Sequence, residues 1–455
     1  MGMGEKVIKD AVHGYVPIPE EYFRRFIDTP HFQRLRRIEQ TSMRVLYPSA
    51  RHDRFIHSVG TFHLGRLALE NLIRNSPQVE IAPEDQEAFK IACLLHDCGH
   101  APFSHTFENY FSAKSPLLEL LKRYAPNREN FHDDLENSAE AAPHEYLSAL
   151  LAVTVFGDAI QSRGADPLLV ARMIVGAEFL TPTPRNALIQ LLNGRAIDVD
   201  KLDYVLRDIA VSGIRTHQVD VQRLLSSLQV VQLDGFKLCF GKQALSAISN
   251  VFEVKNFLQQ WVFSHHTVQY DQHLLKQCVK EAAVAHTGAK DPDSALGAIF
   301  NPNTYLGRGD LPEPCIKMLC DDDLVHLIKK YEVPTANEWL YRQYKMVPLW
   351  KSYSEFCYLF GRAGIHDKKG KIERCLNEIG LAEGTWLLLM QTEKHLVIEH
   401  DALNICMSKE VVVPYGQLTH YLTSSWMEQF YYVYMQRNQL HFKDVVIRRL
   451  KEAIH

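Results

Sequence analysis

Residues 91–108 read IACLLHDCGHAPFSHTFE, and the interpretation of the whole chain starts from this stretch. Among residues of core type it places a set of strong polar side chains: His96, Asp97, His100 and His105. A buried imidazole beside a buried carboxylate is costly unless both groups have partners, and a metal ion is a partner for both at close range. The stretch therefore predicts a metal site whose remaining ligands come from elsewhere in the chain.

The helix that leads into this stretch has recognisable ends. Pro83 suits a first helical turn, and the acids at positions 84, 85 and 87 suit the positive end of the helix dipole. The helix is expected to run to about Cys98, with Gly99 as its C-cap. His96 and His100 have the spacing of a helical ligand pair, but this break would lie between them. Spacing alone therefore does not assign both histidines to one ion.

Composition narrows the class of protein. The 455 residues, with 46% hydrophobic and 23% charged side chains, fit one large domain plus a smaller one, or two to three domains. A net charge of -4 gives no global indication of nucleic acid or a membrane surface as a partner, although it does not exclude a local basic patch that binds nucleic acid. Nine cysteines without paired CxxC spacing indicate reduced thiols rather than a disulfide framework.

The expected location is the cytoplasm, without a membrane partner. No stretch approaches the roughly 20 apolar residues that cross a bilayer. The first ten residues, MGMGEKVIKD, contain no apolar signal region.

The first 210 residues predict mostly helices. An extended arm or hairpin over residues 1–20 precedes an arginine-rich helical segment from Glu20 to Gln40, whose arginines fit a solvated face or a phosphate-binding surface equally well. His57 opens a further helix, and residues 112–140 are expected to form an irregular insertion. In the helical pattern from Ala196 to Asp208, Asp200 is the best candidate for a buried acid, whereas Asp203 and Asp208 fit exposed positions.

The character of the chain changes towards its C-terminus. Residues 230–240 predict a hairpin around Asp234 and Gly235. Beyond about residue 340, strands are expected at 386–390, 395–399 and 411–413, and an aromatic-rich helix at 425–436. The prediction is a mainly α protein with a larger helical part, residues 1–340, and a smaller α+β region, residues 341–455. No long Gly/Ser or Pro linker separates them, so the two parts are expected to dock.

One histidine, the His-Asp pair and a distant aspartate form a mixed nitrogen and oxygen ligand set: His57, His96, Asp97 and Asp200. Such a set suits Zn, Fe, Mn, Ni or Co better than Ca. It resembles the H…HD…D signature of the HD-domain phosphohydrolases. Four longer segments, HDRFIHSVG, LLHDCGHAPFSH, PHE and IDVDKLDY, resemble more specifically the deoxynucleoside triphosphate (dNTP) triphosphohydrolase branch, which includes the eukaryotic SAM-and-HD-domain enzyme and bacterial relatives.

The resemblance implies a helical bundle of the HD-domain type, a divalent transition metal on those four ligands, and hydrolysis of a dNTP to deoxynucleoside and inorganic triphosphate. It also implies Mg with the nucleotide phosphates. The acid/base and phosphate-contacting positions fall on His100 and His105, with Glu145 orienting His105. The implied substrate contacts are Arg54 and Lys201 on the triphosphate, and Gln40, Tyr204 and Asp208 on the sugar.

The resemblance extends to regulation. Asp28, Gln33 and Arg36 match positions that bind an activating guanine nucleotide between subunits, whereas Lys9 stands where the eukaryotic enzyme carries asparagine. The implied partners are a dNTP substrate, an activating GTP or dNTP, and further copies of the chain in a dimer or tetramer.

Two other functions remain open from the sequence. One is a phosphohydrolase or phosphodiesterase that acts on another nucleotide or an oligonucleotide with the same metal site. The other is a non-enzymatic scaffold, gated by nucleotides or bound to nucleic acid. The second makes no use of the complete ligand and acid/base set.

Overall fold

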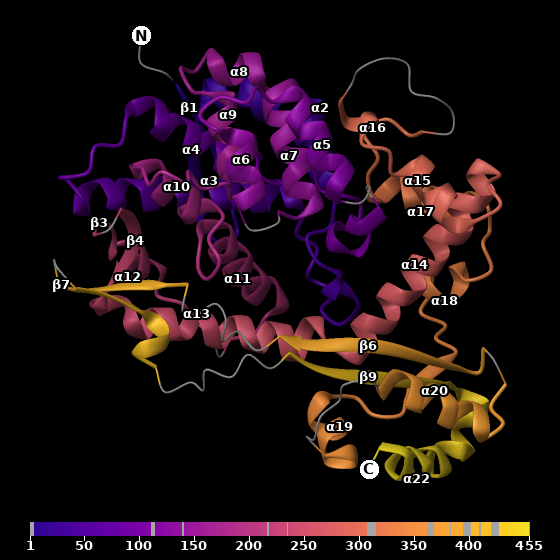
Figure 1. Cartoon of the computed structure of the whole chain (residues 1–455). Helices are drawn as coiled ribbons and strands as arrows, with labels where there is room; N and C mark the ends of the chain where they lie inside the picture. The colour runs from indigo at the N-terminus through magenta and orange to yellow at the C-terminus, as the bar shows by residue number, and fades with distance from the viewer. Residues whose placement is uncertain are drawn as a thin grey trace.

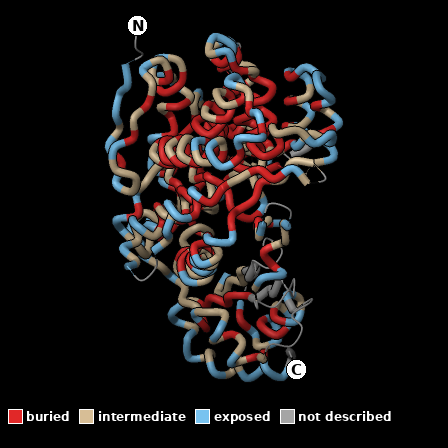
Figure 2. The backbone as a smooth tube through the Cα atoms, turned by 90° about the vertical axis from the view of Figure 1, so that its left-hand side faces the viewer, coloured by how far each residue is buried: buried red, intermediate tan, exposed pale blue. Residues whose placement is uncertain are grey.

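The computed structural model describes residues 4–110, 114–138, 141–215, 218–233, 235–306, 315–361, 368–382, 384–394, 402–408, 411–419 and 427–454. As predicted, the protein is mainly helical with a few small sheets (Figure 1). Buried residues concentrate in the larger helical body, and a second buried group lies in the smaller body near the C-terminus (Figure 2). Among the described residues, no helix is both long enough and apolar enough to span a bilayer.

The centre of the larger body is a group of mutually packed helices: α3 (Arg54–Asn75), α4 (Pro83–Leu95), α7 (Pro143–Thr154), α9 (Pro167–Ile174), α10 (Pro184–Leu192) and α11 (Val199–Ser212). Helix α3 packs on both α4 and α11, and α9 packs on both α4 and α7. Asp53 caps α3 by accepting from the Ile56 N–H, and Asp198 caps α11 by accepting from the Lys201 N–H. The first turns of α3 and α11 therefore have fixed positions, which matters because His57 and Asp200 lie there.

Shorter helices are also present: α1 (Glu20–Tyr22), α2 (Pro30–Arg34), α5 (Lys114–Tyr124), α6 (Phe131–Asn137), α8 (Gly157–Gln161), α12 (Val221–Leu225), α15 (Pro292–Ile299), α16 (Asn303–Leu306), α17 (Asp321–Lys330) and α18 (Ala336–Leu340). The longer α13 (Leu245–Phe257) runs along the base of the body, and α14 (His266–Thr287) rises beside it towards α15 and α17 (Figure 1). Helix α14 contributes Leu275 and Val279 to the main core and Tyr270 and Leu274 to the second core. It therefore joins the two.

The prediction of an irregular insertion over residues 112–140 is wrong for the part of this segment that the structure describes, because that part contains α5 and α6. Leu117, Leu121, Phe131 and Leu135 are buried in the main core. Both helices are short, and prolines and acids interrupt their apolar residues. The helical repeat of apolar residues could therefore not be recognised in the sequence.

The N-terminal arm is an antiparallel hairpin of β1 (Glu5–Asp10) and β2 (Gly14–Pro19). Val16 and Ile18 on one face are fully buried in the main core, while Val7 and Tyr15 on the other face are exposed. The turn between the strands carries Asp10 and His13 towards α11.

The chain returns to the first body late in the sequence. Strands β3 (Leu228–Gln232) and β4 (Phe236–Gly241) form the predicted hairpin, and β7 (Asn404–Ser408) pairs in parallel with β4. With β8 (Val411–Pro414), the order of this sheet is β3-β4-β7-β8. Leu403, Ile405 and Tyr415 consequently belong to the main core.

The second core lies on a three-stranded sheet of order β5-β9-β6, formed by β5 (Met346–Pro348), β6 (Trp386–Lys394) and β9 (Met427–Gln436). Helices α19 (Tyr353–Phe360), α20 (Lys368–Glu378) and α22 (Lys443–Ile454) accompany this sheet (Figure 1). The strands expected at 386–390 and 411–413 are present as parts of β6 and β8, and the one expected at 395–399 lies outside the described residues.

The helix expected at 425–436 is wrong, because residues 427–436 form β9, which pairs with β6 from Met427 to Met435. Residues 431–435 are all buried, on both faces of the strand. A strand buried on both faces has no alternation of apolar and polar residues, so its sequence cannot be told from that of a buried helix.

Candidate metal centre

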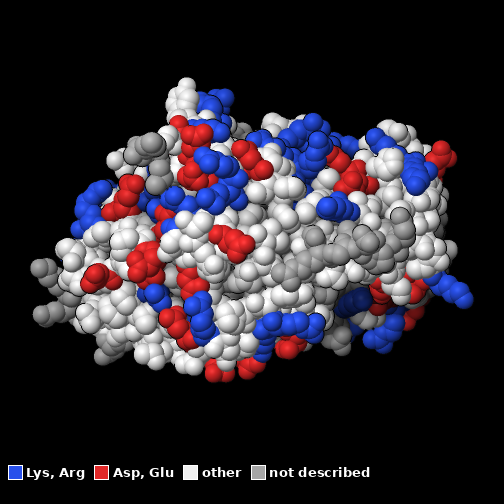
Figure 3. Space-filling model, turned by 90° about the horizontal axis from the view of Figure 1, so that it is seen from above, with Lys and Arg blue, Asp and Glu red and all other residues white. Residues whose placement is uncertain are grey.

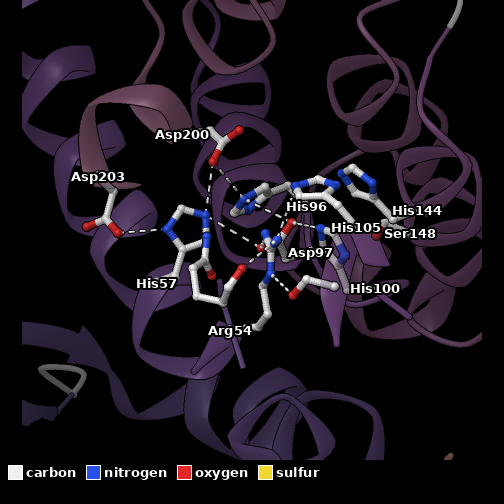
Figure 4. Close-up of polar contacts among 12 residues, drawn as sticks. Arg54, His57, His96, Asp97, His100, His105, His144, Ser148, Asp200 and Asp203 are labelled. Atoms are coloured by element: carbon white, nitrogen blue, oxygen red, sulfur yellow. Dashed lines mark hydrogen bonds and ion pairs between the residues drawn. The ribbon is translucent and has the colours of Figure 1, made fainter. Parts of the chain in front are cut away.

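Three elements bring the four predicted ligands together (Figure 4). His57 lies on α3, His96 and Asp97 lie in the turn after α4, and Asp200 lies in the first turn of α11. His57 Nε2 is 2.9 Å from Asp200 Oδ1 and 3.5 Å from Asp97 Oδ2, and His96 Nε2 is 3.5 Å from an oxygen of each carboxylate. One ligand atom each of His57, His96 and Asp97 lies within 4.8 Å of the others.

The residues present fit a divalent transition metal. The Nε2 atoms of His57 and His96 are buried and make no hydrogen bond among the described residues. Their Nδ1 atoms are engaged on the far side of each ring, His57 by Asp203 Oδ2 at 2.7 Å and His96 by the Cys93 carbonyl at 3.0 Å. Since both acceptors engage the proton on Nδ1, Nε2 is the nitrogen that each ring can offer to a metal ion.

The carboxylates of this centre are held in the charged form. Burial raises the pKa of Asp97, but Arg54, His96 and His100 together lower it well below its usual range. Burial likewise raises the pKa of Asp200, but its close contacts with His57 and His96 bring the pKa well below that range. Two charged carboxylates and the Nε2 atoms of two imidazoles therefore face one point.

Helix α4 ends at Leu95, earlier than expected, and residues 96–99 form a turn. Gly99 is needed for close approach rather than as a C-cap, because a Cβ atom there would lie 2.6 Å from both the His144 carbonyl oxygen and the Ser148 nitrogen. The Gly99 N–H also donates to Ser148 Oγ at 2.8 Å. This contact fixes the start of α7 beside the histidine stretch.

Three histidines form a second group beside the centre: His100, His105 and His144. The rings of His100 and His144 stack at 3.9 Å, and Glu108 accepts from Nδ1 of His105 at 2.8 Å and from Nδ1 of His144. Burial lowers the pKa of His144, but the Glu108 carboxylate outweighs it and leaves the pKa raised. Burial, then Arg54 and His144, lowers the pKa of His100 well below its usual range. The group therefore contains both a proton donor and a proton acceptor.

The expectation that Glu145 orients His105 is wrong, because Glu108 occupies that position. Glu145 lies in the first turn of α7, where it accepts from the Ala142 N–H and, at 2.9 Å, from Asn193 Nδ2. A glutamate three residues into a helix readily folds back on the helix start, and Glu145 is engaged in this way. His144 and Glu108 were missed, although the PHE segment contained the first and the histidine stretch ended on the second.

The burial of the acids on α11 also differs from the prediction. Asp203 and Asp208 are buried, whereas the Asp200 side chain is 32% exposed. Burial of Asp203 is compatible with its charge because Arg207 and two histidines contact its oxygens. His52 Nε2 lies 2.8 Å from Asp208 Oδ1.

The two cations predicted to clamp the triphosphate border the centre. Arg54 is buried, with Nη1 donating to Asp97 Oδ2 at 2.7 Å and Nε donating to Ser104 Oγ at 3.0 Å. Lys201 Nζ donates to Asp198 Oδ2 at 2.6 Å and to the Gly194 carbonyl at 2.9 Å. Both cations are thus positioned by carboxylates.

The remaining predicted residues fall into two groups, the sugar contacts near the metal centre and the regulatory residues near the start of the chain. Gln40 lies next to Arg54, whose Nη2 donates to the Gln40 carbonyl at 3.4 Å, and Tyr204 is half-buried one turn after Asp200. Asp28, Gln33 and Arg36 lie near the start of the chain: Arg36 Nε donates to Gln33 Oε1 at 3.0 Å, and Asp28 is exposed.

Comparison with known proteins supports this reading of the centre. Residues 54–176 match the model of the HD domain family. The chain is 31% identical to deoxynucleoside triphosphate triphosphohydrolase SAMHD1 of Danio rerio over 268 residues, which are 57% of this chain and 42% of that protein. It is 29% identical to the SAMHD1 homolog of Dictyostelium discoideum over 282 residues, 61% of this chain and 49% of that protein. The chain thus spans less than half the length of these two relatives.

A crystal structure of a hypothetical protein from Aquifex aeolicus shares the fold over the whole chain. Its TM-score is 0.62 at 20% identity, with 98% of this chain and 100% of that one covered. Residues 54–176 are therefore similar to the HD domain family, and more than half of the chain is similar to deoxynucleoside triphosphate triphosphohydrolases.

Proposed function

We propose that the chain hydrolyses dNTPs to deoxynucleoside and inorganic triphosphate at a divalent metal held by His57, His96, Asp97 and Asp200. The observation that carries this proposal is the convergence of those four donors beside a paired set of histidines and two cations. A bound divalent metal supplies polarisation of the α-phosphate and a more acidic water. Fe, Mn, Zn, Ni or Co suits these ligands, and Mg suits the nucleotide phosphates.

The side chains around the centre divide the remaining work. Arg54 and Lys201 would neutralise the triphosphate, since both keep their charge beside a carboxylate. Water attacks the α-phosphorus, the bond from phosphorus to the 5′-oxygen breaks, and the leaving oxygen needs a proton. His105, whose Nδ1 is held by Glu108, would deliver that proton from Nε2, and neutral His100 would accept one from the water. Gln40, Tyr204 and Asp208 are proposed sugar contacts.

Activation and assembly belong to the same proposal. Asp28, Gln33 and Arg36 would bind an activating GTP or dNTP at the surface of a dimer or tetramer. Gln33 and Arg36 already contact each other, and Asp28 is exposed near them in sequence. Light scattering with and without nucleotide tests this part, and a monomer in both conditions would contradict it.

A substrate panel separates the proposed reaction from the alternatives. The metal-loaded protein is incubated with each dNTP, with and without GTP, and the phosphate products are identified. Release of inorganic triphosphate supports the proposal, whereas turnover of only other nucleotides or oligonucleotides would favour the wider phosphohydrolase reading. A scaffold function would be indicated if Asp200→Ala left biological activity unchanged. On the face shown in Figure 3, basic and acidic side chains are interspersed, with no separate basic surface for nucleic acid.

A further inference from the structure

A chain of buried polar groups lies behind His57, on the side of its ring that faces away from the metal centre. His57 Nδ1 is 2.7 Å from Asp203 Oδ2, and the other oxygen of Asp203 is 2.6 Å from His13 Nε2 (Figure 4 shows Asp203 and His57). Arg207 donates to both oxygens of Asp203 at 2.9 Å. Each oxygen of Asp203 therefore has two donors, and its orientation is fixed.

The N-terminal hairpin closes this network. Asp10 Oδ2 accepts from Arg207 Nη2 at 2.9 Å, and Asp10 Oδ1 accepts from the N–H groups of Val12 at 2.6 Å and His13 at 3.0 Å. The Asp10 carboxylate thus accepts hydrogen bonds from the turn that contains His13 and also from Arg207, which in turn donates to Asp203. The side chains of Asp10 and Asp203 are fully buried, and that of His13 is 6% exposed.

Gly60 shows how little room the network has. A Cβ atom at this position of α3 would lie 1.9 Å from Asp203 Oδ1 and 2.4 Å from Arg207 Nη2. Helices α3 and α11 therefore approach each other at the point where Asp203 meets His57. A network with no free volume transmits the position of one group to the next.

We propose that Asp10 and His13, at the end of β1 and in the turn that follows it, are positioning residues for His57 as a metal ligand and act through Asp203. The hairpin is distant in sequence from all four ligands, yet it determines which way the Asp203 carboxylate faces. Partners of ligating histidines fix the ring orientation and the tautomer, and their loss typically weakens metal binding about 10- to 100-fold. The inference rests on the metal site of the proposed function and not on its substrate.

The test is a Co²⁺ titration of the full chain after removal of metal. Affinity is measured by competition with a chelator, and the visible absorption of bound Co²⁺ reports the ligand geometry. His13→Ala is expected to bind about 10- to 100-fold more weakly and to shift the absorption, because the His57 ring loses its fixed orientation. His13→Gln, whose amide reaches the same oxygen, is expected to restore both. Val7→Ala, on the exposed face of the same hairpin, is the matched control.

Each outcome decides the matter. Wild-type affinity and an unchanged spectrum in His13→Ala would overturn the inference, even if the variant were less stable to heat. Failure of the unaltered protein to bind Co²⁺ would instead contradict the metal centre of the proposed function. If His13→Ala does not fold, His13→Asn replaces it, since its shorter amide cannot reach Asp203, and wild-type binding by that variant would equally overturn the inference.

Discussion

Glu108 accepts a hydrogen bond from His105, with 2.8 Å between Oε2 and Nδ1. Its second oxygen accepts from His144, so one carboxylate orients two imidazoles. Burial raises the pKa of Glu108, but the two histidines outweigh it and keep the carboxylate charged. Nε2 of His105, on the other side of the ring, lies 3.3 Å from Arg54 Nη2, beside the proposed triphosphate clamp.

Replacing Glu108 with glutamine tests the role of this carboxylate. A neutral amide stabilises a protonated histidine less than a carboxylate does, so kcat is expected to fall about 100-fold, the usual contribution of a positioned acid. Metal content should stay the same, because no proposed ligand contacts Glu108. The measurement is initial-rate dNTP hydrolysis together with elemental analysis. Glu119→Gln, an exposed glutamate of α5, is the control. Full activity in Glu108→Gln would contradict the assignment.

Because α3 and α11 approach each other closely at Gly60, alanine substitutions at two helical glycines, Gly60 and Gly297, are expected to change the stability of the protein differently. Gly60→Ala is expected to destabilise the protein by about 1–3 kcal/mol, because the new methyl group overlaps the Asp203 carboxylate. A Cβ atom added at Gly297 in α15 would meet no described atom within 4 Å other than the adjacent backbone of its own helix, so Gly297→Ala is expected to stabilise by about 0.5–1 kcal/mol. Urea unfolding measures both. Equal stabilities of the two variants would be the contrary result.

His265 predicts a pH dependence away from the metal centre. Burial, then His266 and Lys351, lowers its pKa to about 4, and Nδ1 accepts from the Thr267 N–H at 3.1 Å. The unfolded chain takes up this proton near pH 6.5, before the folded chain does. The contribution of His265 to stability is therefore complete above pH 6.5 and is lost as the pH falls towards 4.

His265→Asn keeps a helix-capping side chain and removes the titration. The free energy of unfolding of this variant should decrease less than that of the unaltered protein between pH 7 and pH 4.5. Urea unfolding at several pH values measures the difference. Parallel profiles for the two proteins would show that the histidine does not titrate in this way.

Asp200 predicts the effect of losing one ligand. Asp200→Asn keeps the size of the side chain but removes the charge that faces His57 and His96. The variant is expected to lose both bound metal and hydrolysis, while its helices remain as in the unaltered protein. Elemental analysis and circular dichroism measure these properties. Full metal content in the variant would remove Asp200 from the proposed ligand set.

The convergence of the four metal donors could be predicted from the sequence, because each donor belongs to a segment with a recognisable pattern and the segments follow one another in a recognisable order. His57 and Asp200 are far apart in sequence, yet they lie 2.9 Å apart. The sequence does not show whether Glu145 or Glu108 orients His105. That role depends on which of the two carboxylates is engaged by the backbone at the start of α7. The burial of Asp203 was equally inaccessible, since it depends on His13, Arg207 and the missing Cβ of Gly60.

The limits on predicting the fold have a similar cause. Helix α4 and the β3-β4 hairpin carry strong local signals in proline, acids and turn residues. Strand β9 and the pairing of β7 with β4 depend on partners distant in sequence. No local pattern specifies such partners.

The most direct test of the proposed reaction is the identity of its phosphate product. The metal-loaded protein is incubated with each dNTP, alone and with GTP or a second dNTP, and the products are resolved by phosphorus NMR. Attack at the α-phosphorus with departure of the 5′-oxygen predicts inorganic triphosphate and the free deoxynucleoside. Pyrophosphate with a deoxynucleoside monophosphate, orthophosphate with a diphosphate, or no consumption of any dNTP would contradict it.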